Sequence, residues 1–177
     1  MRNTTFTRNI YGGLSASPGS STAIHNRGGI LTLTNSTIAD NIQEFVAPSI
    51  HAALVTRVGA TTVLQNTIVA RNTDALGRDC IGPITSLGNN LFGDLTGCGV
   101  VLQPSDLTGD AGLGTSTDNG TPGNAHVPLL ATSRAINAAN ATACPEKDQI
   151  GQLRQPHCDI GAIEFSHNHN ELVQNLP

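Results

Sequence analysis

The sequence predicts an all-β fold, a parallel β-helix of about three coils followed by an irregular, disulfide-bonded C-terminal cap. A motif bounded by Asn recurs at 3–9, 35–41 and 66–72, with offsets of 32 and 31 residues. Each copy contains a short segment with β-branched residues. No copy contains the roughly ten residues of helical periodicity that a helical repeat needs. Repeats of this length are units that stack on one another.

Composition supports a single β-rich domain. The chain has 177 residues, with 3% aromatic residues, 12% charged residues and 19 Gly, which does not fit long charged helices. The hydrophobic fraction of 38% disfavours disorder. The net charge of -4 gives no reason to expect a nucleic acid partner. No apolar run approaches the about 18 residues of a membrane span, and the polar first residues do not resemble a signal peptide.

The first 72 residues form the predicted coils. The second and third motifs are each preceded by another strand-like stretch, at 30–34 and 61–65. Stacking the motifs in register places Phe6, Ile38 and Val69 above one another. We expect these three side chains to form an apolar stack inside the coils.

Asn residues bound each motif, and stacking explains them. Asn tolerates the left-handed backbone conformation of a corner between strands. Amides that repeat at one corner can hydrogen-bond along the coil axis. The predicted ladder is Asn9, Asn41 and Asn72, with a second candidate ladder of Asn3, Asn35 and Asn66. Sugar binding by these amides is the functional alternative.

After Thr73 the repeat fades, and Gly, Pro, Asp and Leu become frequent. Residues 84–91 resemble one more irregular coil, and 127–137 carry the strongest apolar cluster of this half. We expect 73–165 to contain the last coil and a cap that seals the open end of the stack, because an uncovered last coil exposes core and strand edges. Residues 166–177 form a tail.

Four cysteines permit three pairings. Local pairing closes the shortest loops, so Cys80–Cys98 and Cys144–Cys158 are the predicted disulfides. Metal binding or free thiols are the alternatives, but no two of these cysteines are spaced as CxxC. Disulfides indicate an extracellular or cell-surface protein. Because a signal sequence is missing, we expect a processed product or the C-terminal part of a longer secreted precursor.

The order of motifs resembles a known family. TLTNSTIADN, LQNTIVARN, DCIGPITSLGNNLFGDLTGC, RAINAAN and DQIGQLRQPHCDIGAIEF follow one another between Asn26 and Phe165. This series is similar to the C-terminal region of bacterial right-handed parallel β-helix surface proteins of the choice-of-anchor Q domain type. The resemblance implies a secreted, pectate-lyase-like fold, mostly without assigned activity. It also implies a C-terminal anchoring signal, and 166–177 do not resemble one.

Candidate catalytic and metal sites are weak. Asp40, Glu44 and Asp74 are the acids of the coils, and each occupies a different coil position. Arg8 and Arg71 stand where Asp40 stands, which predicts a surface salt-bridge stripe rather than a paired-carboxylate site. Asp106, Asp110 and Asp118 lack the spacing of a calcium loop and favour turns. His167 and His169 fit a solvated tail. We expect no enzyme activity, cofactor or bound metal.

These features predict a structural protein of the cell surface, in adhesion or self-assembly. A polysaccharide-binding or polysaccharide-degrading module is the alternative, with a surface glycan as partner. The first coil has no preceding cover, so we expect head-to-tail stacking into a homo-oligomer or filament, or covering by upstream coils. The assembly residues are Asn3, Thr4, Thr5 and Phe6, with Leu172, Val173 and Leu176 of the tail as an added strand.

Overall fold

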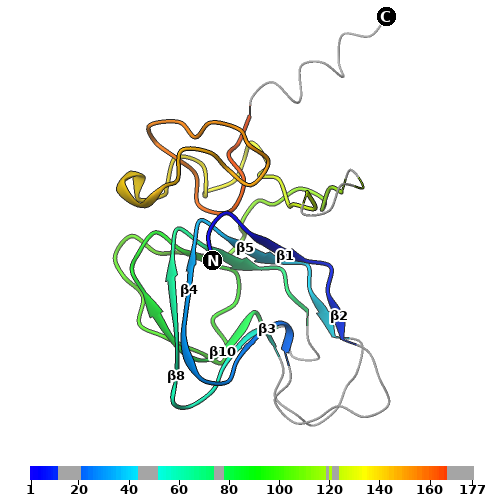
Figure 1. Ribbon diagram of the computed structural model, residues 1–177, viewed down its shortest axis with the longest axis vertical. Helices are drawn as coiled ribbons and strands as arrows, with labels where there is room; N and C mark the ends of the chain where they lie inside the picture. Colours follow the sequence, from blue (N-terminus) through cyan, green and yellow to red (C-terminus); the bar gives the residue numbers. More distant parts are fainter. Residues whose placement is uncertain (12–20, 44–51, 74–77, 119, 121–123, 167–177) are drawn as a thin grey trace, which may run out of the picture.

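A computed structural model describes residues 1–11, 21–43, 52–73, 78–118, 120 and 124–166. The described chain is all-β, with one short 3-10 turn, η1 (Ala141–Ala143). Figure 1 shows the strands wound into coils, with a largely irregular segment beside them. The strands are β1 (Thr5–Thr7), β2 (Ile10–Tyr11), β3 (Ser21–Asn26), β4 (Gly29–Thr34), β5 (Thr37–Ala39), β6 (Ile42–Gln43), β7 (Ala52–Thr56), β8 (Ala60–Gln65), β9 (Ile68–Ala70), β10 (Cys80–Ser86), β11 (Leu91–Phe92), β12 (Cys98–Val100) and β13 (Leu107–Thr108).

The strands form parallel sheets that share one solenoid-like stack. The first sheet has the order β1-β5-β9-β11-β13, and the second contains β3, β7, β10, β8 and β4, with β12 added to β10. All pairs of named strands are parallel. The stack therefore continues through β13: β10 and β11 overlap the irregular coil predicted at 84–91, and β12 and β13 extend beyond it. β12 and β13 lie where the sequence has lost its period, so the repeat does not mark them.

The register of the first sheet matches the predicted apolar stack. Phe6 pairs with Ile38, Ile38 with Val69, and Val69 with Phe92. Ile38, Val69 and Phe92 are fully buried in one cluster, and Phe6 packs against it. The prediction of an interior stack is confirmed, with Phe92 as a further member.

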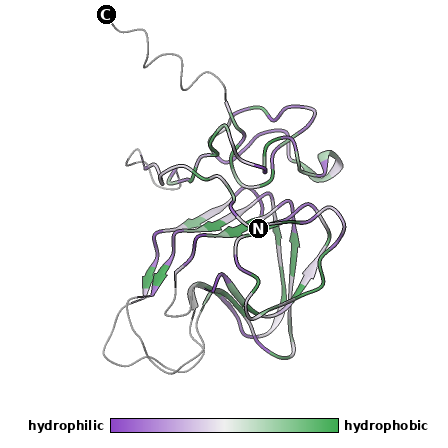
Figure 2. Ribbon diagram, turned by 180° about the vertical axis from the view of Figure 1, so that it is seen from behind, coloured by the Kyte–Doolittle hydropathy of each residue, from purple (hydrophilic) through white to green (hydrophobic). Residues whose placement is uncertain are grey.

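A second core lies on the outer face of this sheet. Ala39, Ile68, Ala70 and Leu91 are buried there against apolar residues of the C-terminal half. We call the described residues between 111 and 165 the lateral segment, because both views show them beside the coils, over the first sheet (Figures 1 and 2). The segment contributes Ala111, Leu113, Val127, Leu129, Ala135 and Ile160 to this core.

The lateral segment runs back along the stack. Asn residues with positive φ mark one corner of successive coils, and their side-chain amides donate to carbonyls of the segment. The pairs are Asn89 with Ala138, Asn66 with Asn140, Asn35 with Asp159 and Asn3 with Lys147. In the described residues, the part of the chain expected to hold the end cap lies beside the stack. This part of the chain packs on the side of the stack, because the first sheet offers an apolar outer face.

Candidate functional site

The predicted corner amides form a continuous hydrogen-bonded row. Asn9 Nδ2 donates to Asn41 Oδ1 at 2.7 Å, and Asn41 Nδ2 donates to Asn72 Oδ1 at 2.8 Å. The backbone N–H groups of Asn9 and Asn41 donate to the same two oxygens. Asn41 is fully buried and Asn72 nearly so, whereas Asn9 is exposed. Asn41 and Asn72 therefore face the protein and are not available to a sugar.

The row ends at Asp79, which the sequence analysis did not identify. Asp79 Oδ1 accepts from both Asn72 N and Asn72 Nδ2 at 2.8 Å, and Oδ2 accepts from Asp94 N at 2.7 Å. A carboxylate can end the row because it only accepts hydrogen bonds. Burial raises the pKa of Asp79 to about 6, although these hydrogen bonds act in the opposite direction. The one feature of the sequence that could have indicated this residue is its position directly before Cys80.

The second candidate ladder differs from the first. Asn66 Nδ2 donates to Asn35 Oδ1 at 3.2 Å, but both amides also donate to the lateral segment. Asn3 accepts a hydrogen bond from Arg154 and donates to Lys147 O. This row therefore joins the coils to the lateral segment more than it joins coil to coil.

The two disulfides have the predicted pairing. Cys80–Cys98 joins β10 to β12, with a Cα–Cα distance of 5.0 Å. Cys144–Cys158 lies within the lateral segment, with a Cα–Cα distance of 6.7 Å. The described chain has no free cysteine. The first bridge therefore lies within the stacked strands, and the second lies in the lateral segment.

A buried ion pair holds the end of the lateral segment. Arg154 Nη1 lies 3.0 Å from Glu164 Oε2, and both side chains are almost completely buried. Arg154 Nη2 donates to Gly161 O at 2.8 Å. Asp159 accepts from the N–H groups of Asn137 and Phe165, and burial raises its pKa to about 6. These charged residues are committed to backbone groups and to each other, so they are structural.

The predicted assembly residues have mixed surroundings. Thr4 Oγ1 donates to Arg2 O, and Thr5 Oγ1 donates to Gln149 Oε1 of the lateral segment. The side chains of Asn3 and Thr5 are thus used within the chain. The backbone of β1 remains at an edge, because β1 pairs with β5 alone in the described part of the chain. Leu172, Val173 and Leu176 lie outside the described residues.

The charged corner contains one ion pair. Asp40 Oδ2 lies 2.7 Å from Arg71 Nη2, which also donates to Gly114 O at 2.8 Å. Within the described residues Arg8 makes no such bond, so the predicted stripe is reduced to one pair. Glu44, Asp74, His167 and His169 lie outside the described residues.

The acidic residues expected in turns make local hydrogen bonds in the described chain. Asp110 and Asp118 each accept from the N–H two residues ahead, as turn-forming Asp does. Asp106 accepts from Ser86, Asn90 and Gln103. The described residues contain no group of three His, Cys, Asp or Glu side chains that could hold a metal ion.

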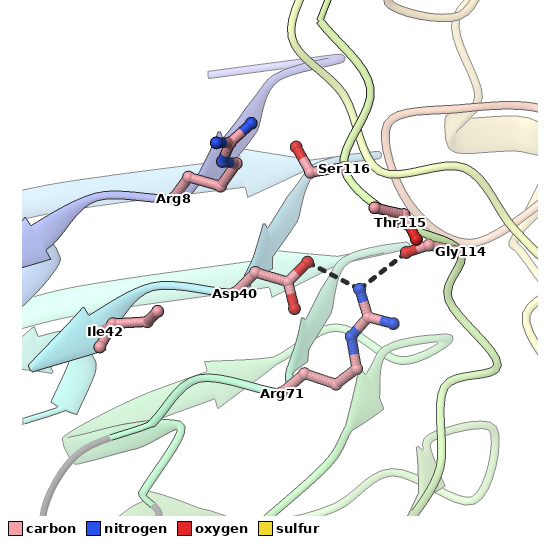
Figure 3. A pocket seen from close by; sticks show the side chains of 7 residues that line it. All are labelled: Arg8, Asp40, Ile42, Arg71, Gly114, Thr115 and Ser116. Atoms are coloured by element: carbon pink, nitrogen blue, oxygen red, sulfur yellow. Dashed lines mark hydrogen bonds and ion pairs between the residues drawn. The ribbon is translucent and has the colours of Figure 1, made fainter.

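A groove separates this corner from the lateral segment (Figure 3). It has a volume of about 600 Å³ and is open to solvent. Ser116 Oγ is buried without a hydrogen-bond partner in the described structure, at the same groove that the Arg8 side chain lines. The groove is lined by Arg8, Asp40, Ile42, Arg71, Gly114, Thr115 and Ser116.

Comparisons with protein-family models, with curated proteins and with solved structures found no match to this chain. No helix of the described residues is long and apolar enough to cross a membrane.

Proposed function

We propose that this chain is a non-enzymatic extracellular structural protein, a right-handed parallel β-helix whose copies stack head to tail. One observation carries the proposal. In the described structure β1 and β3 each have one neighbouring strand, and they lie at the same end of the stack. At this end β4 pairs with β8, and its Thr32 and Thr34 are also bonded to residues 1–3, so only the start of β4 remains an open edge. Edge strands present unpaired N–H and C=O groups to another chain.

The opposite end of the stack offers a matching edge. There β12 pairs only with β10 and β13 only with β11, among the described strands. Because all these strand pairs are parallel, one copy can add its first coil to the last coil of another without reversing direction. Such a contact joins two different surfaces, and it builds a filament unless the rotation closes a ring.

Apolar side chains at the two ends support the same reading. At the first end Phe6, Ile24 and Leu31 are only partly buried against the interior cluster. At the other end Leu95 and Val100 are in the same situation. Stacking would bury the apolar surface that these side chains still expose. Each Å² buried would stabilise the contact by about 25 cal/mol.

The chemistry of the buried acids supports a non-enzymatic role. Asp79, Asp159 and Glu164 are buried and accept hydrogen bonds from backbone N–H groups. Glycoside hydrolysis needs two carboxylates about 5 to 9.5 Å apart across a groove. Asp40 is the one acid among the residues that line the groove described above, and it is paired with Arg71. The two disulfides support the extracellular location.

Self-association tests the proposal. Sedimentation velocity over a wide concentration range should show a growing series of oligomers. Ile30 is 78% exposed on the edge strand β4, so Ile30→Lys should raise the dissociation constant by about tenfold or more. Val58, which is 96% exposed in the turn before β8, gives the control Val58→Lys, which should associate like the parent. A monomer at all concentrations, or equal effects of both substitutions, would reject head-to-tail stacking.

A polysaccharide-binding module is the second candidate function, and the groove at Arg8 favours it. Its ligand would lie against the outer side of the first coils, where Arg8 directly follows the edge strand β1. Glycan-array binding by a monomeric Ile30→Lys protein would support this second function independently of assembly.

A further inference from the structure

We propose that the groove between Arg8 and Ser116 binds the carboxylate of a hydroxylated ligand, the chemistry of a uronic acid. This inference rests on the second candidate function and not on head-to-tail assembly, although Arg8 directly follows the edge strand β1. The residues that carry it are Arg8, Asp40, Arg71 and Ser116.

The charge of the groove favours an anion. Asp40 and Arg71 form an ion pair at 2.7 Å and largely neutralise one another. Arg8 is exposed, and in the described structure its guanidinium has no hydrogen-bond or ion-pair partner. The lining therefore carries one uncompensated positive charge. A guanidinium offers a planar pair of donors that matches the two oxygens of a carboxylate.

The opposite wall supplies a hydroxyl that the fold does not use. Ser116 Oγ is buried and has no partner among the described residues. A buried polar atom without a partner is rare and needs an explanation. Figure 3 shows the Ser116 hydroxyl and the Arg8 guanidinium at the same end of the groove. A ligand seated there would receive hydrogen bonds from both walls.

The other end of the groove suits hydroxyl groups of the ligand. Asp40 is bonded to Arg71 through Oδ2, and its side chain remains 27% exposed. A carboxylate oxygen accepts hydrogen bonds from hydroxyls, and the same oxygen repels a second carboxylate. This arrangement favours one acidic group followed by hydroxyls, as in a uronic acid, over an acidic peptide that carries a carboxylate on each residue.

The positions of these residues are fixed by the fold rather than by a ligand. Arg8, Asp40 and Arg71 occupy equivalent left-handed corners, with φ of 56°, 58° and 59°. Gly114 is held by its N–H bond to Pro128 O, and its carbonyl accepts from Arg71. The two walls are therefore tied together next to the open position at Arg8.

Titration by heteronuclear NMR tests the site on the full chain. Glucuronate should shift the amide signals of 114–116 and of Arg8, and glucose should not. Arg8→Gln should weaken glucuronate binding by about tenfold, the size of one lost charge-assisted contact. Ser116→Ala should weaken it by about threefold. Arg27 is an exposed Arg outside the groove, so Arg27→Gln should bind like the parent.

Each competing ligand gives a distinct result. Acetate should bind more weakly than glucuronate, because it has no hydroxyls for Asp40. Equal shifts with acetate would reduce the site to a small-anion site and overturn the proposal. Tighter binding of a tetraglutamate peptide would overturn it in favour of an acidic protein partner. Equal loss in Arg8→Gln and Arg27→Gln would show attraction by overall charge alone.

Discussion

Replacing Asn41 by Ala removes the middle member of the amide row. Asn41 is fully buried, and its Nδ2 donates to Phe6 O at 3.0 Å, Ala39 O at 3.2 Å and Asn72 Oδ1 at 2.8 Å. Each such bond contributes about 1 kcal/mol net, and a buried carbonyl left unpaired costs about 1 to 3 kcal/mol. We expect Asn41→Ala to lower the free energy of unfolding by about 3 kcal/mol.

Asn9 provides the matched control for this substitution. It occupies the equivalent corner one coil away, but it is exposed, so water replaces its partner after Asn9→Ala. We expect this control to lose less than about 1 kcal/mol. Urea denaturation followed by circular dichroism measures both values, with equal m-values required for the comparison. Equal, small losses at both positions would refute the claim that the row stabilises the stack.

Four further results are expected. The raised pKa of Asp79 stabilises the fold below about pH 4, and this contribution, of order 3 kcal/mol, should be lost as pH rises through about 6; Asp79→Asn should reduce the slope of stability against pH in this range, and Asp159, whose pKa is also raised to about 6, should account for the remaining slope. Gly161→Ala should destabilise well beyond Gly109→Ala in thermal unfolding, because both have positive φ but only the first places a Cβ 2.8 Å from Ile68. Removing Cys144–Cys158 should cost about 3 kcal/mol, whereas unchanged stability would contradict the loop-closure argument. Deleting 166–177 should weaken sedimentation-detected association if the tail adds a strand to a neighbouring copy, and unchanged association would remove the tail from the interface.

The repeating part of the chain could be predicted because each position is constrained twice. Phe6, Ile38 and Val69 must pair in register and also face the interior, so sequence period and hydropathy agree. Asn41 must fit the corner between two strands, and it must also hydrogen-bond to the equivalent Asn residues along the axis of the stack. When one residue must meet two independent structural requirements, the same residue type recurs at that position in each repeat, and the sequence shows the recurrence. The parallel pairing and the amide row follow from that pattern.

The lateral segment has no comparable pattern. Apart from the apolar cluster at 127–137, its buried residues, such as Leu113 and Ile160, stand among Gly and Asp at no regular spacing, and they come together in contact with the first sheet. The groove depends on this contact as well, since Ser116 comes from the segment and Arg8 from the coils. The spacing of residues in the sequence could not predict this site, because neither the coils nor the lateral segment contains all of its residues.

One local signal did point to the side of the stack. In Ile68-Val69-Ala70 three consecutive residues are apolar, and all three are buried. In a strand with one solvent-exposed face, apolar and polar residues alternate, whereas in a strand that is covered on both faces they do not. Val69 faces the interior cluster, so Ile68 and Ala70 required a second covering layer. When apolar and polar residues do not alternate in such a strand, we expect another part of the chain to cover the outer face of the sheet. A cap on the end of the stack would leave this outer face exposed.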